Sequence, residues 1–184
     1  METPKSKLSL GVSLVVLGLI LILGRSPTNV ATENTFANEP VKVEGFNQTS
    51  ESFTNYPERI VIPGAGIDLP VKKADIVRGY WEVFDDSAGW GGGSGLPGQI
   101  GNQVIFAHAR QGLFLPLKNV HLGDRVYVLA AEGWFSYIAT DIKEVYPSQV
   151  EVIKPTDDET LTLYTCSGYQ DTKRLIVVAK RVTE

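Results

Sequence analysis

Apolar and polar residues divide this chain of 184 residues into three parts with different patterns. The first part contains an uncharged run of 16 residues, Leu8 to Leu23, made mostly of Leu, Val and Ile. As a helix the run covers roughly 24 Å, and it spans the roughly 30 Å hydrocarbon core of a membrane if its flanking cations reach the headgroups. The alternative is a cleaved secretory signal peptide, but the run is at or beyond the limit of about 7 to 15 residues for its apolar region, and no Ala-x-Ala cleavage site follows it. The pattern therefore predicts that residues 1–24 hold a cytoplasmic N-terminus and a retained transmembrane helix.

The charges around this run predict its orientation. Lys5, Lys7 and the N-terminal amine precede the run, whereas Arg25 is followed by Glu33 and Glu39. Positive charge is retained on the cytoplasmic side of a membrane span. We therefore expect a single-pass protein of the cell membrane, with a cytoplasmic N-terminus and an extracellular remainder.

Residues 25–56 form the second part, which is rich in Asn, Thr, Ser and Glu and has only scattered apolar residues. It sustains neither a helical nor a strand periodicity. Such a composition buries too little apolar surface to offset the entropy lost on ordering the chain. The segment is interpreted as a polar, flexible linker between the anchor and residues 57–184.

Short β-rich segments separated by Gly and Pro make up the third part, residues 57–184. Alternation in Trp134–Val145 is typical of a strand with one buried face, and the continuously apolar Leu175–Ala179 indicates a strand covered on both faces. The glycine-rich stretch Gly89–Gly98 predicts a loop, and Pro116 limits any helix around it to a turn or two. The predicted strands are Arg59–Ile62, Asp68–Val71, Gln103–Ala107, Arg125–Ala130, Trp134–Val145, Thr160–Cys166 and Arg174–Arg181. So many short strands predict an all-β domain closed, or nearly closed, into a barrel, because closure removes exposed edges.

Composition excludes several classes of function. The chain has 17 Lys and Arg against 21 Asp and Glu, a formal net charge of −4, so no basic excess exists to neutralise nucleic-acid phosphates. The single cysteine, Cys166, excludes an internal disulfide framework and a Cys-rich metal site. The two histidines, His108 and His121, leave few groups for imidazole chemistry.

Three residues at the ends of predicted strands form the candidate site. Cys166 ends an apolar strand before a Ser-Gly turn, His108 follows another apolar strand, and Arg174 begins a third. Taken singly, each has a commoner structural explanation: a small buried hydrophobe, a surface histidine and a solvated arginine. A lone thiol outside the membrane is open to oxidation, however, and the three groups together supply a nucleophile, a proton donor and an oxyanion stabiliser. His121 is the weaker histidine candidate, because the Gly-Asp turn after it exposes it to solvent.

The motifs around these residues resemble those of the sortases, which are membrane-anchored cysteine transpeptidases of bacteria. Residues Thr162 to Cys166 read TLYTC and fit the T-L-x-T-C signature of that family. Family-like segments also occur in family order: RIVIPGAGIDLPV at 59–71, GLPGQIGNQVIFAHAR at 95–110, Leu122-Gly123-Asp124, and the RLIVVAKR ending. The resemblance covers residues 57–184 and implies a sortase-like barrel of about eight strands with short helices.

The resemblance implies a role for each candidate residue. Cys166 would be the nucleophile, His108 the general acid and base, and Arg174 the group that steadies the substrate carbonyl or oxyanion. Many family members have an arginine directly after the histidine, whereas this chain reads His108-Ala109-Arg110. Arg110 is therefore a rival for the arginine role, and Arg174 is preferred because it lies where the family's arginine lies.

The resemblance also implies the reaction and its partners. Sortases cleave an LPxTG-like sorting signal through a thioacyl enzyme and pass the protein to an amine, either of a peptidoglycan precursor or of a pilin. The loop of residues 147–159 would cover the sorting signal, as the loop between the sixth and seventh strands does in that family. No cofactor or metal is expected. Calcium activation at Asp157-Asp158-Glu159, as in some relatives, is the alternative to a solvated loop.

Two alternatives stand beside a housekeeping enzyme of the class D or E type. The first is a pilin-polymerising sortase, which often carries an N-terminal lid or a C-terminal membrane helix. Residues 25–55 show no clear lid motif, and the sequence ends at Glu184 directly after the last predicted strand, which favours simple anchoring. The second is a membrane-tethered barrel that binds without turnover. The complete set of Cys166, His108 and Arg174 favours an enzyme.

Overall fold

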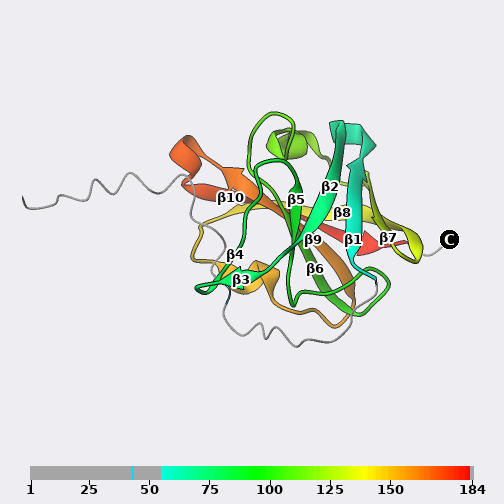
Figure 1. The fold of residues 1–184 in the computed structure, drawn as a ribbon. Helices are drawn as coiled ribbons and strands as arrows, with labels where there is room; N and C mark the ends of the chain where they lie inside the picture. Colours follow the sequence, from blue (N-terminus) through cyan, green and yellow to red (C-terminus); the bar gives the residue numbers. More distant parts are fainter. Residues whose placement is uncertain (1–42, 44–54, 183–184) are drawn as a thin grey trace, which may run out of the picture. The chain divides into compact units, whose positions relative to one another are not determined.

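A closed β-barrel dominates the computed structural model, which describes Val43 and residues 55–182 (Figure 1). The barrel strands are β1 (Pro57–Ile62), β2 (Ile67–Ala74), β5 (Ala88–Gly91), β6 (Gly101–Phe106), β7 (Arg125–Ala130), β8 (Gly133–Val145), β9 (Glu159–Ser167) and β10 (Lys173–Arg181). They close in the order β1-β2-β5-β6-β9-β10-β8-β7. β2 pairs with β5 and β6 pairs with β9 in parallel, and the other neighbours are antiparallel. The predicted all-β barrel is confirmed.

Outside the barrel, the described chain contains one short hairpin and several single-turn helices. The hairpin consists of β3 (Ile76–Val77) and β4 (Tyr80–Trp81). The 3₁₀ helices are η2 (Pro63–Ala65), η3 (Leu115–Asn119), η4 (Val150–Ile153) and η5 (Tyr169–Asp171). Pro116 does confine η3 to the short helix that the sequence predicts, because a proline stops helix propagation.

The two N-terminal parts predicted from the sequence fall largely outside the described residues. The predicted anchor, residues 1–24, lies wholly outside them, and no described helix is long and apolar enough to cross a membrane. Three residues of the predicted linker are described: Val43 is buried, Asn55 donates a hydrogen bond to the Pro97 carbonyl, and the Tyr56 ring contacts Trp90. The linker boundary itself stays a prediction.

Alternation along the strands creates two apolar cores, one inside the barrel and one on its outer face. On β9, Leu161 and Leu163 point into the inner core, whereas Tyr164 belongs to the outer one. On β10, Val177 lies in the inner core and Ile176 in the outer. The continuously apolar part of β10 is thus covered on both faces, as its sequence predicts.

The prediction of a loop at Gly89–Gly98 was wrong at its start, because Ala88–Gly91 forms barrel strand β5. Gly91 is required there because a Cβ at this position would lie 2.5 Å from Cζ2 of the buried Trp81 ring. At Gly89 a Cβ would lie 3.0 Å from Cζ of Phe106. These two rings stack on each other with centroids 5.6 Å apart. The glycines therefore let two aromatic rings lie against the strand.

Gly91→Ala is expected to lower the free energy of unfolding by about 1–3 kcal/mol, because the added methyl overpacks against the buried Trp81 ring. Gly89→Ala meets the end of the Phe106 side chain at a longer distance and should cost less. Chemical denaturation of both variants measures the difference. Equal stability of Gly91→Ala and the wild type would contradict this account of β5.

Candidate active site

Strand register brings the three candidate residues to one face of the barrel. Cys166 on β9 pairs directly with Arg174 on the antiparallel strand β10. On the other side, Phe106 of β6 pairs with Tyr164 of β9, and His108 lies two residues beyond Phe106 as Cys166 lies two beyond Tyr164. Side chains two residues apart along a strand share a face. Arg174 therefore lies beside Cys166 on the outer face, and the register of β6 with β9, continued past the end of β6, leads to His108 on the other side of Cys166.

Backbone contacts fix His108 just beyond the end of β6. The Ala107 N–H donates to the Tyr164 carbonyl at 3.3 Å, and Thr165 Oγ1 donates to the Ala107 carbonyl at 2.8 Å. The His108 carbonyl accepts the N–H groups of residues 110 and 114, at 2.9 and 3.0 Å, where the chain turns away. The imidazole is held at the rim with 22% of its side chain exposed.

Arg174 is the most deeply buried group of the site, at 1% exposure. Its Nε donates to the Tyr164 hydroxyl at 3.0 Å, and its Nη1 donates to the carbonyls of Asp171 and Lys173 at 2.7 and 2.9 Å. The Asp171 carbonyl is presented by a turn in which Gln170 and Asp171 have φ of 52° and 57°. Left-handed geometry is unfavourable for Gln170, whereas aspartate tolerates it better. This turn places the Asp171 carbonyl where it accepts the Arg174 hydrogen bond and so orients the guanidinium beside Cys166.

Opposing effects act on the half-buried Cys166 thiol. Burial raises its pKa above the ordinary value, the Arg174 charge lowers it, and the Asp171 carboxylate raises it. Burial also raises the pKa of Tyr164, against the lowering effect of Arg174. Burial outweighs Arg174, so the net effect raises the Cys166 pKa and favours the neutral thiol. A reaction at this site therefore needs a base that removes the thiol proton, or a substrate whose binding favours the thiolate.

The two weaker sequence candidates interact with other acidic residues, Arg110 with Asp85 and His121 with Asp124. Arg110 is half-exposed, and its Nη2 donates to the Asp85 carbonyl and to Asp85 Oδ1, the latter at 2.7 Å. The same carboxylate oxygen lies 3.8 Å from Nε2 of His108, so Arg110 adjoins the histidine through Asp85. His121 is 84% exposed in the turn before β7, a strand that β10 and β8 separate from β9.

A groove of about 480 Å³ adjoins His108. Its lining is Val77, Arg78, Tyr80, Trp81, Glu82, Val83, Asp85 and His108. The sequence does not predict the β3–β4 hairpin that lines this groove, because its strands have only two residues each. The signal available in the sequence was Gly79 between two pairs of β-forming residues, residues 76–77 and 80–81. In the structure, Arg78 and Gly79 form a turn with φ of 55° and 84°. Tyr164 was also missed, although alternation from Cys166 places it on the same face.

The acidic cluster Asp157-Asp158-Glu159 does not converge on one point. The Asp158 carboxylate accepts hydrogen bonds from Lys180, whereas Oε1 of Glu159 accepts one from the Tyr137 hydroxyl at 2.7 Å. Among the residues that the structure describes, no three His, Cys, Asp or Glu side chains are grouped to hold a metal ion. The expectation that the protein needs no cofactor stays a prediction.

Comparison with known proteins gives a consistent set of relatives. A family model described as the Sortase domain matches residues 60–182. Sortase A of Bacillus anthracis is 28% identical over 128 residues, which cover 66% of this chain and 57% of that protein. Sortase A of Listeria monocytogenes is 27% identical over 164 residues, covering 83% of this chain and 70% of the relative. The chain thus spans little more than half the length of the Bacillus protein.

Solved structures share the barrel. Streptococcus agalactiae sortase C1, in its complex with MTSET, superposes with a TM-score of 0.61 at 28% identity, covering 68% of this chain and 67% of that one. Other structural neighbours carry the names sortase A and sortase D. The shared architecture therefore extends across several sortase classes.

Proposed function

The chain belongs to the sortase family of cysteine transpeptidases, and from this membership we propose that it cleaves an LPxTG-like sorting signal and transfers the protein to an amine. One observation carries the proposal: Cys166 on β9 pairs directly with Arg174 on β10, and His108 follows the end of β6, the neighbour of β9 on its other side. A nucleophile, a proton-transfer group and a fixed positive charge at one point are what acyl transfer requires.

In the first half of the reaction, the neutral imidazole of His108 accepts the Cys166 thiol proton, and the resulting thiolate attacks the Thr carbonyl carbon of the Thr–Gly bond. Negative charge develops on the carbonyl oxygen, and the buried Arg174 cation stabilises it. The intermediate collapses with cleavage of the C–N bond, and the imidazolium of His108 protonates the departing Gly amine. The products are a Thr–Cys166 thioester and the C-terminal fragment.

In the second half, an acceptor amine attacks the thioester carbonyl carbon. The neutral imidazole of His108 accepts the amine proton, and the C–S bond breaks to return the Cys166 thiolate. The net change exchanges one amide for another, so no oxidant, reductant or external energy source is needed. The groove beside His108 is a site at which an acceptor could reach the imidazole.

We further propose that the barrel acts at the extracellular face of the cell membrane, held by residues 1–24. Both substrates of such a reaction, a membrane-arrested precursor and a lipid-linked or pilin amine, are confined near that face. Tethering raises their effective concentration at the site. The linker would let the barrel move across the membrane surface.

Incubation of the full chain with an array of LPxTG-like peptides tests the function. We expect mass spectrometry to find an adduct on Cys166 equal to the peptide truncated after Thr. Added peptidoglycan-type or pilin-type amines should then yield distinct amide products, which separates wall anchoring from pilin polymerisation. A folded protein that binds peptide without forming any adduct or cleavage product would instead support the inactive binding module.

A further inference from the structure

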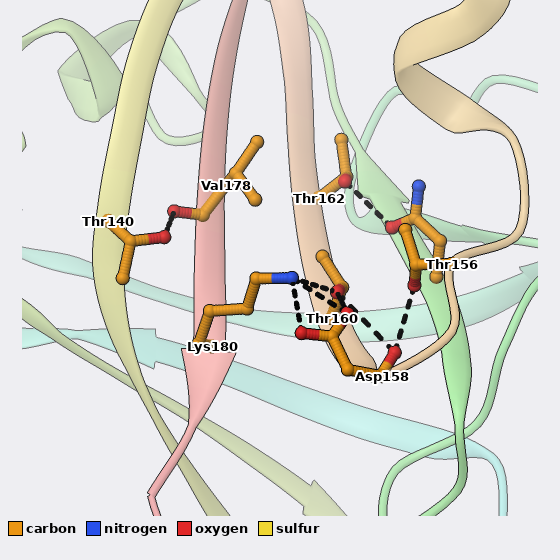
Figure 2. A network of polar contacts seen from close by, with 8 residues as sticks. Thr140, Thr156, Asp158, Thr160, Thr162, Val178 and Lys180 are labelled. Atoms are coloured by element: carbon orange, nitrogen blue, oxygen red, sulfur yellow. Dashed lines mark hydrogen bonds and ion pairs between the residues drawn. The ribbon is translucent and has the colours of Figure 1, made fainter.

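Two buried polar side chains connect the outer face of the barrel to the loop between β8 and β9. Asn102 on β6 and Thr162 on β9 are 3% and 1% exposed. Thr162 Oγ1 donates to Asn102 Oδ1 at 2.7 Å, the contact drawn from Thr162 in Figure 2. The Asn102 amide Nδ2 donates to the carbonyls of Val152 and Lys154, at 3.1 and 3.0 Å. Each bond joins a donor to an acceptor, because a carbonyl oxygen only accepts and the asparagine amide nitrogen only donates.

The two accepting carbonyls lie on either side of Ile153, the buried residue of η4. The Ile153 side chain packs into the outer core with Val104, Phe106, Tyr164 and Ile176. That core covers the face of β6, β9 and β10 from which Cys166 and Arg174 project. Asn102 therefore holds the η4 backbone at the point where the loop covers the face leading to the thiol.

We propose that Thr162 and Asn102 form a latch that positions the β8–β9 loop for binding of the sorting-signal peptide. Thr162 orients the amide, and the amide in turn holds the loop through two carbonyls. Both are positioning residues, because neither is exposed enough to contact a substrate directly. The role in peptide binding rests on the proposed transpeptidase function.

A second group of contacts in Figure 2, around Asp158, holds the C-terminal end of the same loop. Lys180 Nζ lies 2.8 Å from both carboxylate oxygens of Asp158, and Thr156 Oγ1 donates to the Asp158 carbonyl at 2.9 Å. Lys180 and Asp158 are 40% and 61% exposed, and exposed ion pairs contribute little to stability. A buried hydrogen bond leaves an unsatisfied group when it is broken. The latch therefore has a stronger hold on the loop than the exposed Lys180–Asp158 ion pair alone.

The test compares Thr162→Val with two reference variants in the full chain. Valine keeps the shape of threonine but removes the hydroxyl donor, whereas Thr162→Ser keeps that donor. Thr140→Val makes the same chemical change at an exposed position on β8, where Oγ1 donates to the Val178 carbonyl at 3.3 Å (Figure 2). Asn102→Asp is nearly isosteric with asparagine and removes the two donors to the loop, so it tests the latch from the other side.

Thr162→Val should raise the peptide KM about tenfold and leave kcat within about twofold, as expected for loss of one hydrogen bond that acts on binding alone. Hydrogen exchange of residues 147–158 should accelerate by a similar factor while exchange in β6 and β9 stays slow. Asn102→Asp should reproduce both changes, whereas Thr162→Ser and Thr140→Val should match the wild type.

Unchanged KM and unchanged loop exchange in Thr162→Val and Asn102→Asp would overturn the latch. So would exchange that accelerates equally throughout the barrel, because that result indicates general destabilisation. If the wild type turns over no peptide, the transpeptidase proposal fails. In that case the exchange measurements still decide whether Thr162 and Asn102 hold the loop.

Discussion

Cys166→Ala is expected to abolish the thioester adduct and to lower peptide cleavage by at least about 10⁴-fold, as for loss of a nucleophile in other acyl-transfer enzymes. The thiol is half-buried at the end of β9, so alanine removes little packing and the barrel should keep its stability. Mass spectrometry of the peptide mixture and a thermal melt measure the two effects. Cleavage at the wild-type rate by a folded Cys166→Ala protein would exclude covalent catalysis at this site.

The pH dependence of alkylation provides an independent test of the environment of Cys166. Burial raises the pKa of the folded thiol, with Asp171 acting in the same direction and Arg174 opposing them. The alkylation rate of the folded chain should therefore rise with pH at higher values than that of the denatured chain. A midpoint at or below the denatured one would show that the Arg174 charge prevails over burial.

The same shift links stability to pH. A thiol whose pKa is raised on folding favours its protonated form in the folded state. Its contribution to stability is fully present below the unfolded pKa and is lost as the pH rises through the folded pKa. Cys166→Ala should remove this part of the alkaline loss of stability, which denaturant titrations at several pH values would measure.

The sequence predicted most of the barrel because its strands carry local signals. Alternation in Trp134–Val145 and the apolar run Leu175–Ala179 correspond to β8 and β10, with only small differences at the ends. Strand β5 lacks such a signal, since glycine is unfavourable in strands and is needed here only to admit Trp81 and Phe106. That requirement depends on tertiary contacts, so no local pattern reveals it.

The site shows a similar division between local and long-range information. The sequence identifies the candidate residues at strand ends one by one, and the alternation of side chains along a strand places Tyr164 on the same face as Cys166. The parallel pairing of β6 with β9 joins segments far apart in the chain, and this register brings the end of β6, which His108 follows, alongside the strand that carries Cys166. The turn at Arg78-Gly79 is a local signal for the hairpin, but the position of the hairpin and of Asp85 beside His108 depends on tertiary contacts.

Arg174→Ala is expected to lower kcat/KM by about 10²–10³-fold, the usual effect of losing one group that stabilises an oxyanion. It should also raise the pKa of Cys166 further, because Arg174 is the group that lowers it. Arg174→Lys keeps the charge but lacks the planar fork that reaches the Tyr164 hydroxyl and two carbonyls at once. The lysine variant should therefore keep an alkylation midpoint closer to that of the wild type while still losing activity.

Arg110→Ala is the matched control for the arginine assignment. Arg110 is half-exposed and paired with Asp85, so its removal should change kcat/KM by no more than about threefold, as for an ordinary surface pair. Because Arg174 is buried, its variants need a thermal melt and near-UV circular dichroism to establish that they fold. A large loss in Arg110→Ala with near-normal turnover in a folded Arg174→Ala protein would reverse the assignment. An upward shift of the alkylation midpoint in Arg174→Ala alone would identify Arg174 as the cation that acts on the thiol.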